Sequence, residues 1–291
     1  MTGPPTTRVD VVAAVRDEEA LIDEFVDRLL GLELPADVEL GIIFVEDSSR
    51  DATVVRLREA ARRDPRVRYF ALDGSFGQGP ALVFGLSRSD ADASITMDAD
   101  GSHPPELVPA LIEAHRGGAD VVQAVRRRHG GREAYRDLGT ALFPILGRLL
   151  AGVALERQNV HFRLLSATQR DRVLGHPAWW GILRLRLDST KVHHVSFDAP
   201  ARTVGRSKYG PWRLVRLSLE GAVSLMSPRR FGAVVASLGI VAVASAMAGV
   251  AGVAVLSAVL AGVLGLVRAR LPRAELLERM RVRESSAGAA G

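Results

Sequence analysis

The chain of 291 residues contains no cysteine, so disulfide bonds and thiolate metal sites are excluded. Residues 1–7 are polar and lack the apolar stretch of a secretory signal. Aromatic residues make up only 5%, and no basic patch is interleaved with them, which argues against a nucleic-acid partner. These absences fit a cytoplasmic domain that does not act on nucleic acid.

Positively charged side chains outnumber negatively charged ones. The formal net charge is +5, and arginine supplies nearly all of the positive side chains while lysine is scarce. A basic balance favours an anionic partner, such as an anionic lipid or a phosphorylated substrate. Hydrophobic residues make up 47% of the chain, enough for one large domain with appendages.

Charged residues are missing altogether from residues 231–267. Because about 20 apolar residues cross a membrane as one helix, this segment is long enough for two helices, with a turn at Gly249–Gly252. Arginines flank the segment on both sides: Arg229, Arg230, Arg268, Arg270 and Arg273. The positive-inside rule then predicts a transmembrane helical hairpin with both ends in the cytoplasm. The alternative is a buried pair of Ala- and Gly-rich helices in a soluble protein.

The first half of the chain alternates between two hydrophobic patterns. Short apolar runs typical of strands cover residues 9–15, 40–45, 66–72, 93–97 and 120–125. Segments with helical spacing cover residues 18–30, 51–62, 80–86 and 105–115. Strands that alternate with helices predict an α/β fold with a parallel, doubly wound sheet.

Acidic residues follow three of the predicted strands, at the point where each strand ends. The three pairs are Asp17 and Glu18, Glu46 and Asp47, and Asp98 and Asp100. Open α/β sheets bind their ligands at the carboxyl ends of the strands. A solvated turn is also acidic, so one such pair says little, but three pairs at one edge predict a ligand site.

The sequence Asp98-Ala99-Asp100 carries the strongest chemical signal. Two carboxylates two residues apart can share one hard cation such as Mg²⁺ or Mn²⁺, which acts as a Lewis acid on a diphosphate leaving group. An Asp-x-Asp sequence alone is common and mostly structural. Its position after a strand and before His103-Pro104-Pro105 makes the metal interpretation stronger.

Five stretches together identify a family. They are V-E-D-S-S-R-D at 45–51, F-G-Q at 76–78, M-D-A-D-G-S-H-P-P at 97–105, F-R-L at 162–164 and S-K-Y at 207–209. In their order and spacing, the chain resembles the family-two inverting glycosyltransferases of GT-A fold. It is most similar to the dolichyl- and polyprenyl-phosphate sugar transferases of the dolichol-phosphate mannosyltransferase type. The resemblance covers nearly the whole chain, including a carboxyl-terminal membrane hairpin.

The resemblance implies a nucleotide-sugar donor, a polyprenyl or dolichyl phosphate acceptor and inversion at the anomeric carbon. It implies a divalent metal, Mg²⁺ or Mn²⁺, held by Asp98 and Asp100. The matching donor-binding positions, with Glu18 and Asp47 at the base and ribose, are Asp17, Glu18, Asp47, Gln78 and Asp98. The candidates for catalysis and for binding phosphate are Asp100, Arg126, Arg136, His161 and Lys208. A solvated basic run is an equally good interpretation of Arg126, Arg127 and Arg128.

Several positions depart from the family pattern. Arg16 replaces a tyrosine, Ser48 replaces the glycine of an Asp-Gly-Ser turn, and Gly74–Ser75 replaces an Arg-Asn pair. Ser102 stands where a glutamine is often found, which puts a third metal ligand in doubt, and His161 replaces an aspartate. One alternative is therefore a hydroxyl acceptor, such as a sugar, lipid or natural product, with His161 or an aspartate as the base. His161 could instead have a structural role. A further alternative is a non-catalytic membrane protein that binds nucleotide sugars.

The predicted domain organisation has four parts. Residues 1–210 form the GT-A domain, and residues 211–230 form an amphipathic helix that lies in the membrane interface or faces the core. Residues 231–267 form the transmembrane hairpin, and residues 268–291 form a cytoplasmic tail. The chain is thus expected to be a multi-pass membrane protein that contacts membrane lipid, with its catalytic domain and both termini in the cytoplasm. A homo-oligomer stays open as an alternative to a monomer.

Overall fold

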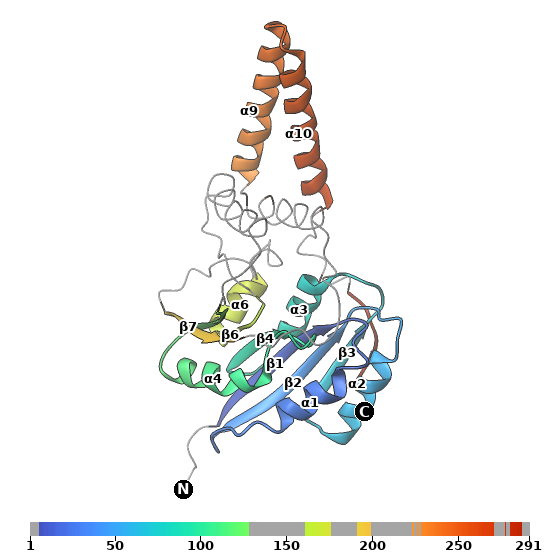
Figure 1. Ribbon diagram of the computed structural model, residues 1–291, viewed down its shortest axis with the longest axis vertical. Coiled ribbons are helices and arrows are strands. Elements are labelled where there is room, and N and C mark those ends of the chain that lie inside the picture. The colour runs from blue at the N-terminus through green and yellow to red at the C-terminus, as the bar shows by residue number, and fades with distance from the viewer. Residues whose placement is uncertain are drawn as a thin grey trace.

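The computed structural model describes residues 6–127, 161–175, 191–198, 223, 226, 228–270, 277 and 280–286. Over these residues the chain forms one mixed β-sheet with helices on both faces and a pair of long helices that projects away from the sheet (Figure 1). The predicted α/β architecture is confirmed.

The sheet contains eight strands in the order β7-β5-β6-β4-β1-β2-β3-β8. Their bounds are β1 (Thr7–Val15), β2 (Val38–Glu46), β3 (Val67–Leu72), β4 (Ala93–Asp98), β5 (Val121–Arg126), β6 (Arg163–Ser166), β7 (Val192–Phe197) and β8 (Val282–Ser285). The strands β4, β1, β2 and β3 are parallel neighbours, as predicted. The sheet is mixed because β6 runs antiparallel to β4 and β5, and β8 runs antiparallel to β3.

Helices cover both faces of the sheet and divide the core in two. The helices around the sheet are α1 (Ile22–Leu30), α2 (Thr53–Arg63), α3 (Gln78–Leu86), η1 (Pro105–Leu107), α4 (Val108–Arg116) and α6 (Ala167–Gly175). Val9, Val11 and Ala13 of β1 share one core with α1, α2 and α4, while Val12 shares the other with α3 and α6. Because both faces are covered, the central strands are apolar along nearly their whole length.

Helix α3 packs closely on β1 and β2 because its Gly85 has no side chain. A Cβ atom at Gly85 would lie 2.4 Å from Val12 Cγ1 and 2.9 Å from Val45 Cγ2. The glycine therefore allows the close approach that brings the amino end of α3, which begins at Gln78, to the carboxyl ends of these strands.

The first helix begins later than its sequence pattern predicts. Helical spacing extends back to residue 18, but α1 begins at Ile22. The Glu18 carbonyl accepts from the Leu21 and Ile22 N–H groups, so residues 18–21 form a turn before α1. The backbone N–H groups of Glu18 and Glu19 donate to side chains of the loop after β2, and these tertiary contacts hold that turn.

Three strands have no counterpart in the sequence pattern. Strands β6 and β8 have four residues each, too short for a clear hydrophobic period, and β7 carries polar His193 and His194. Strand β8 lies within residues 268–291, for which a cytoplasmic tail was predicted. This part of the segment completes the edge of the sheet beside β3.

The helices α9 (Pro228–Met247) and α10 (Ala251–Arg270) pack against each other with a tight turn between them. Gly249 in this turn has a φ of 73°, which glycine adopts readily. The two helices and the turn lie where the uncharged segment predicted them (Figure 1). Their surfaces are apolar and open, since Ile240 and Leu256 are each 69% exposed.

One helix among the described residues is long and apolar enough to cross a membrane. It covers Arg229–Met247, with a mean hydropathy of 1.8, and its most apolar stretch is not buried against other elements. Ala251–Val267 of α10 is also apolar but shorter. Of the interfacial helix predicted at 211–230, most residues lie outside the described ones, and residues 228–230 are the first turn of α9.

Candidate active site

The carboxyl ends of β1, β2 and β4 meet at one edge of the sheet, which we call the carboxyl edge. Val15 pairs with Glu46, and Ala14 pairs with Asp98, so the three strands end side by side. The three acidic pairs predicted from the sequence therefore lie together at this edge. A parallel sheet makes this inevitable, because neighbouring strands that point the same way end at the same edge.

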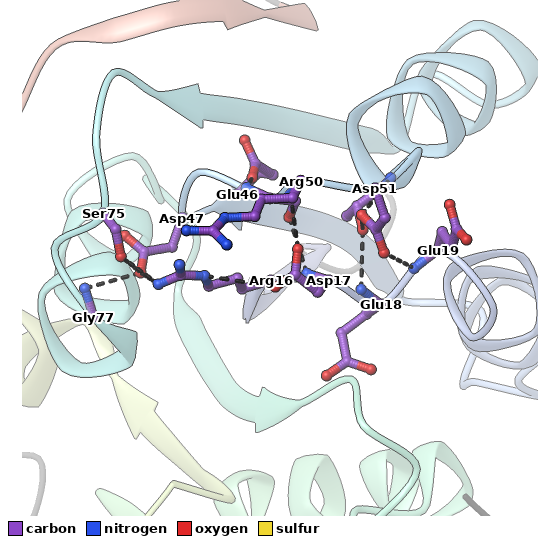
Figure 2. A network of polar contacts seen from close by, with 12 residues as sticks. Arg16, Asp17, Glu18, Glu19, Glu46, Asp47, Arg50, Asp51, Ser75 and Gly77 are labelled. Carbon is purple, nitrogen blue, oxygen red and sulfur yellow. Dashed lines mark hydrogen bonds and ion pairs between the residues drawn. The ribbon is translucent and has the colours of Figure 1, made fainter. Parts of the chain in front are cut away.

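Two loops at the carboxyl edge, residues 16–19 and 47–53, are tied together by reciprocal hydrogen bonds (Figure 2). The Asp17 N–H donates to Ser49 Oγ at 3.0 Å, and Asp17 Oδ1 accepts from the Arg50 N–H at 2.8 Å. The further pairs are Glu18 N–H to Thr53 Oγ1 (3.0 Å), Glu19 N–H to Asp51 Oδ2 (3.2 Å) and Ala52 N–H to Glu19 Oε2 (2.7 Å). The Glu18 carboxylate points away from this network (Figure 2).

Asp51 accepts three hydrogen bonds from residues of these two loops. Its Oδ1 accepts from the Thr53 N–H at 3.0 Å and from Thr53 Oγ1 at 2.5 Å. Burial raises the pKa of Asp51, but the hydrogen bonds from Thr53 and Glu19 outweigh burial, so the pKa is lowered overall. Asp51 is therefore charged at neutral pH and keeps both loops in place.

Asp47 organises the loop after β3. Only 4% of Asp47 is exposed. Its carboxylate accepts hydrogen bonds from the Phe76 N–H (2.6 Å), the Gly77 N–H (2.9 Å) and Ser75 Oγ (3.0 Å). Asp47, a predicted donor-binding residue at the end of β2, thus shapes the loop between β3 and α3.

Two residues of these loops have positive φ angles without being glycine. Asp17 has a φ of 54° and Ser48 a φ of 61°. This conformation is unusual for Ser and is found mainly where surrounding contacts impose it, as at ligand sites. It also gives a physical reason for the family's glycine at this position, because Ser48 adopts the conformation for which glycine is suited.

Two other departures from the family pattern contact each other. Arg16, in place of a tyrosine, donates from its NH1 group to Ser75 Oγ at 2.5 Å, and the same nitrogen lies 4.0 Å from Asp47 Oδ2. Ser75 itself replaces an asparagine of the family. The guanidinium of Arg16 therefore joins the loops after β1 and β3 (Figure 2), a role that the sequence did not reveal.

Gln78 and His103 hold Asp98 from two sides. Gln78 Nε2 donates to Asp98 Oδ1 at 2.5 Å, so two residues predicted to bind the donor are in direct contact. The Asp98 backbone N–H donates to His103 Nδ1 at 2.8 Å, and His103 Nε2 lies 3.8 Å from Asp98 Oδ2. Since Nδ1 accepts a hydrogen bond, the proton of the neutral imidazole is on Nε2, facing the carboxylate.

His103 is buried and acts as an apolar ring as well as a hydrogen-bond acceptor. It is 1% exposed and stacks on Phe162, with 4.8 Å between the ring centroids. Burial lowers the pKa of His103 to about 4; the charge of Asp100 opposes this and that of Arg126 adds to it. The His-Pro-Pro and Phe-Arg-Leu motifs, far apart in sequence, thus meet beneath the Asp98 turn.

Stability should fall with acid because of His103. The unfolded chain takes up a proton near pH 6.5, whereas the folded protein resists it to about pH 4. Hence the stabilising contribution is complete above pH 6.5 and is lost as the pH falls toward 4, by about 3 kcal/mol. Denaturant unfolding of the metal-free protein at pH 7 and pH 4.5 measures this loss. A His103→Gln variant should lack it, and an equal loss in both proteins would show that other groups cause it.

Asp100 follows Asp98 in a tight turn. Its Oδ1 accepts from the Ser102 N–H at 3.0 Å, and Gly101 between them has a φ of 77°. Ser102 therefore shapes the Asp100 turn through its backbone. Within the described ranges, no group of three or more His, Cys, Asp and Glu side chains is arranged to hold a metal.

Arg126 and His161 lie at the same edge as Asp98. Strand β5 runs in the direction of β4, because both pair antiparallel with β6, so its last residue, Arg126, reaches the carboxyl edge. His161 precedes β6, which begins at this edge. Arg126 is exposed and close enough for its charge to act on His103. The remaining candidates, Arg136 and Lys208, lie outside the described residues.

The carboxyl edge lies within a segment that matches a known protein family. The model of "Glycosyl transferase family 2" matches residues 10–176, which include the carboxyl ends of β1, β2 and β4. The chain belongs to this family. The enzyme class predicted from the sequence, a glycosyltransferase that uses nucleotide sugars, is thereby confirmed, and so is the resemblance on which it was based.

Two curated relatives and one solved structure show the nature of the similarity. The prophage bactoprenol glucosyl transferase homolog of Escherichia coli (strain K12) is 30% identical over 243 residues, covering 80% of this chain and 79% of its own. The undecaprenyl-phosphate 4-deoxy-4-formamido-L-arabinose transferase of Pseudomonas syringae pv. syringae (strain B728a) is 29% identical over 219 residues, covering 74% and 65%. Glucosyl-3-phosphoglycerate synthase of Mycobacterium tuberculosis, solved with Mn²⁺ and uridine-diphosphate-glucose, has a TM-score of 0.53 at 22% identity, covering 75% and 78%. This last likeness shows the shared GT-A fold.

Proposed function

We propose that this glycosyltransferase moves a sugar from a nucleotide-sugar donor to a polyprenyl phosphate at a membrane surface, with inversion at the anomeric carbon. The observation that carries the proposal is the carboxyl edge, where Asp98 and Asp100 lie beside the interlocked loops after β1 and β2. The names of the two relatives, a bactoprenol glucosyl transferase homolog and an undecaprenyl-phosphate sugar transferase, support the acceptor class.

The interlocked loops, residues 16–19 and 47–53, are the proposed binding site of the nucleotide. Asp17 and Glu18 belong to the first of these loops. The Glu18 carboxylate points out of the loop network (Figure 2), and we assign it to the nucleotide. Asp47 acts from beneath, since its carboxylate holds the backbone of Phe76 and Gly77. Gln78 in turn orients Asp98. The M. tuberculosis enzyme, which has the same fold, was solved with uridine-diphosphate-glucose, and this supports a nucleotide-sugar donor.

The donor set at Asp98 and Asp100 fits a divalent cation of the Mg²⁺ or Mn²⁺ type. Mg²⁺ is commonly bound by one or two carboxylates together with water and substrate phosphates, so two aspartates suffice without a third protein ligand at Ser102. When bound, the metal supplies Lewis-acid stabilisation of the departing diphosphate. Gln78 and the Asp98–His103 contact keep the first of these carboxylates oriented before the donor arrives.

The residues of the carboxyl edge then have to position an acceptor that needs little activation. A phosphate monoester is largely ionised at neutral pH, since its second pKa is about 6, and it can attack the anomeric carbon without a strong base. Attack from the face opposite the leaving diphosphate inverts that carbon. Arg126 is exposed at the end of β5, and its guanidinium is suited to bind the acceptor phosphate. Arg136 and Lys208 are proposed for the same purpose.

The helices α9 and α10 are the proposed membrane anchor. An apolar helix of the length of Arg229–Met247 is sufficient to cross a hydrocarbon core, and α10 packs along it with a small-residue surface. Arg229 and Arg230 at the start of α9, and Arg268 and Arg270 at the end of α10, favour a cytoplasmic position for both ends. This arrangement brings the carboxyl edge to the membrane face on which the polyprenyl phosphate lies.

A donor screen tests the proposed function. Membranes that contain the full-length protein are supplied with labelled nucleotide sugars, polyprenyl phosphate and Mn²⁺, and the extracted lipid is analysed by mass spectrometry. The expected result is a sugar–phosphate–polyprenyl product with at least one donor and of inverted configuration. Transfer to a polyprenol or to a sugar hydroxyl, but not to the phosphate, would favour the hydroxyl-acceptor alternative. Donor binding without any transferred sugar would overturn the proposed reaction.

A further inference from the structure

Strand β8 meets β3 in a β-bulge at the carboxyl edge. Ala71 pairs with Glu284, but the next residue, Leu72, pairs with Val282, so Arg283 is an extra residue on its strand. A bulge bends the strand and redirects the side chain of the extra residue, and bulges are common beside active sites. Here the bulge lies at the carboxyl end of β3, next to the loop that Asp47 organises.

The bulged Arg283 contacts a carboxylate that is completely buried. Its NH2 group lies 3.0 Å from Glu46 Oε2, and Glu46 is 0% exposed. The other carboxylate oxygen, Glu46 Oε1, accepts a hydrogen bond from the Ser49 backbone N–H. A buried carboxylate is strongly disfavoured without a cation beside it, so Arg283 stabilises the carboxylate whose other oxygen holds the turn at Ser49.

The turn at Asp47–Arg50 belongs to the proposed nucleotide-binding site and contains its strained residue, Ser48. Ser48, with its φ of 61°, lies between Asp47 and Ser49. Ser49 Oγ accepts from Asp17, and the adjacent Arg50 N–H donates to the Asp17 carboxylate. A positive φ at serine persists only when the surroundings hold it, and the Glu46–Ser49 bond is one of the contacts that do so.

Strand β8 is anchored to the sheet independently of Arg283. Glu284 forms a bidentate ion pair with Arg58, with both N–O distances at 2.7 Å, and accepts from the Tyr69 hydroxyl at 2.5 Å. These hydrogen bonds lower the pKa of Glu284 to about 2. In addition, the Asp73 N–H donates to the Arg281 carbonyl at 2.8 Å. Because these contacts hold β8 in the sheet, the contact of Arg283 with Glu46 is not needed for that purpose. Its effect is on Glu46 and the turn at Ser49.

We propose that Arg283 is a positioning residue for the nucleotide sugar. By compensating the buried charge of Glu46, it fixes the Asp47–Arg50 turn in the conformation that receives the nucleotide. This inference rests on the proposed function, because it assigns the turn to the donor. It also means that a residue beyond α10, on the strand by which the chain returns to the sheet, takes part in forming the donor site.

Amide hydrogen exchange and nucleotide binding together test the proposal. In the full-length protein in lipid nanodiscs, Arg283→Ala should raise the exchange rates of the Ser49 and Arg50 amides. It should also weaken binding of UDP in the presence of Mn²⁺ by about tenfold, measured by calorimetry. Arg283→Lys, which keeps the charge, should recover part of both effects. Arg281→Ala, which removes an exposed arginine side chain just before the same strand, should change neither, and it is the matched control.

The double variant Glu46→Gln/Arg283→Ala separates charge compensation from the loss of a side chain. A neutral amide at position 46 still accepts from the Ser49 N–H and no longer requires a cation, so exchange and UDP affinity should return toward the values of the unaltered protein. Unchanged exchange or unchanged UDP affinity in Arg283→Ala would overturn the positioning role. Equal effects of Arg281→Ala would also overturn it, because they would show that the contact of Arg283 with Glu46 is not the cause. If the unaltered protein transfers no sugar from any donor in the screen, the proposed function itself fails.

Discussion

Replacing Asp100 with asparagine should lower kcat for sugar transfer by about 10²–10³-fold, the range found when one group that stabilises developing charge is removed. Asparagine keeps the size of the side chain and an oxygen that accepts from the Ser102 N–H. It lacks the negative charge that a divalent cation requires. The loss should therefore appear in turnover, measured as lipid-linked sugar formed under saturating donor, rather than in folding.

Asp90→Asn is the matched control for this variant. Asp90 lies just before the amino end of β4, at the far end of the strand from Asp98, and its side chain is 77% exposed and paired with Arg8. An exposed ion pair contributes little to stability, so activity should stay within twofold of the unaltered protein. Asp100→Asn with activity as high as Asp90→Asn would remove Asp100 from the catalytic site. Equal losses of activity and of thermal stability would assign it a structural role.

Replacing residues 228–270 with a short Gly/Ser linker should release the protein from membranes. The replaced segment contains the apolar Arg229–Met247 helix and α10, whose outer surfaces are open. After an alkaline carbonate wash, which removes peripheral proteins, the unaltered protein should sediment with the membrane and the variant should not. Strand β8 is kept in this design, because it follows α10 in the chain and completes the sheet.

The same variant tests whether the hairpin serves the acceptor. Binding of UDP and Mn²⁺ should stay within about threefold, since the residues of the carboxyl edge are unchanged. Transfer to membrane-embedded polyprenyl phosphate should fall by more than about tenfold because the enzyme and the lipid no longer share a surface, whereas a short-chain soluble acceptor should still react. A control in which two Leu/Ala helices of equal length replace α9 and α10 should stay in the membrane. A linker variant that still resists the carbonate wash would contradict the predicted anchor.

The acidic groups of the site could be located from sequence because their positions follow from local pattern. Asp17, Asp47 and Asp98 each come after a short apolar run, and the alternation with helices makes these runs parallel strands. Parallel neighbours end at one edge, so the meeting of these residues needed no knowledge of distant contacts. The uncharged segment between Arg230 and Arg268 likewise predicted two helices and a turn from composition alone.

The roles of individual side chains could not be found in this way. Asp47 was predicted to contact the nucleotide, and sequence did not show that its carboxylate accepts from the backbone of Phe76 and Gly77 and from the hydroxyl of Ser75, which follow a different strand. His103 was part of a recognisable motif, but its contact with Phe162 joins segments that sequence does not show to be adjacent. Such contacts depend on how strands are ordered in the sheet, and that order is a property of the whole core.

The amino-acid sequence by itself determined the α/β architecture, the family, the acidic carboxyl edge and the helix pair, because each depends on short-range periodicity or on a contiguous motif. Only the tertiary structure decided where α1 begins, that β6, β7 and β8 exist, and that Arg283 reaches Glu46. Short polar strands carry too little hydrophobic pattern to be read locally, and pairing free energy from a neighbouring strand is what forms them. The residues that complete the candidate donor site therefore come from both sides of the hairpin.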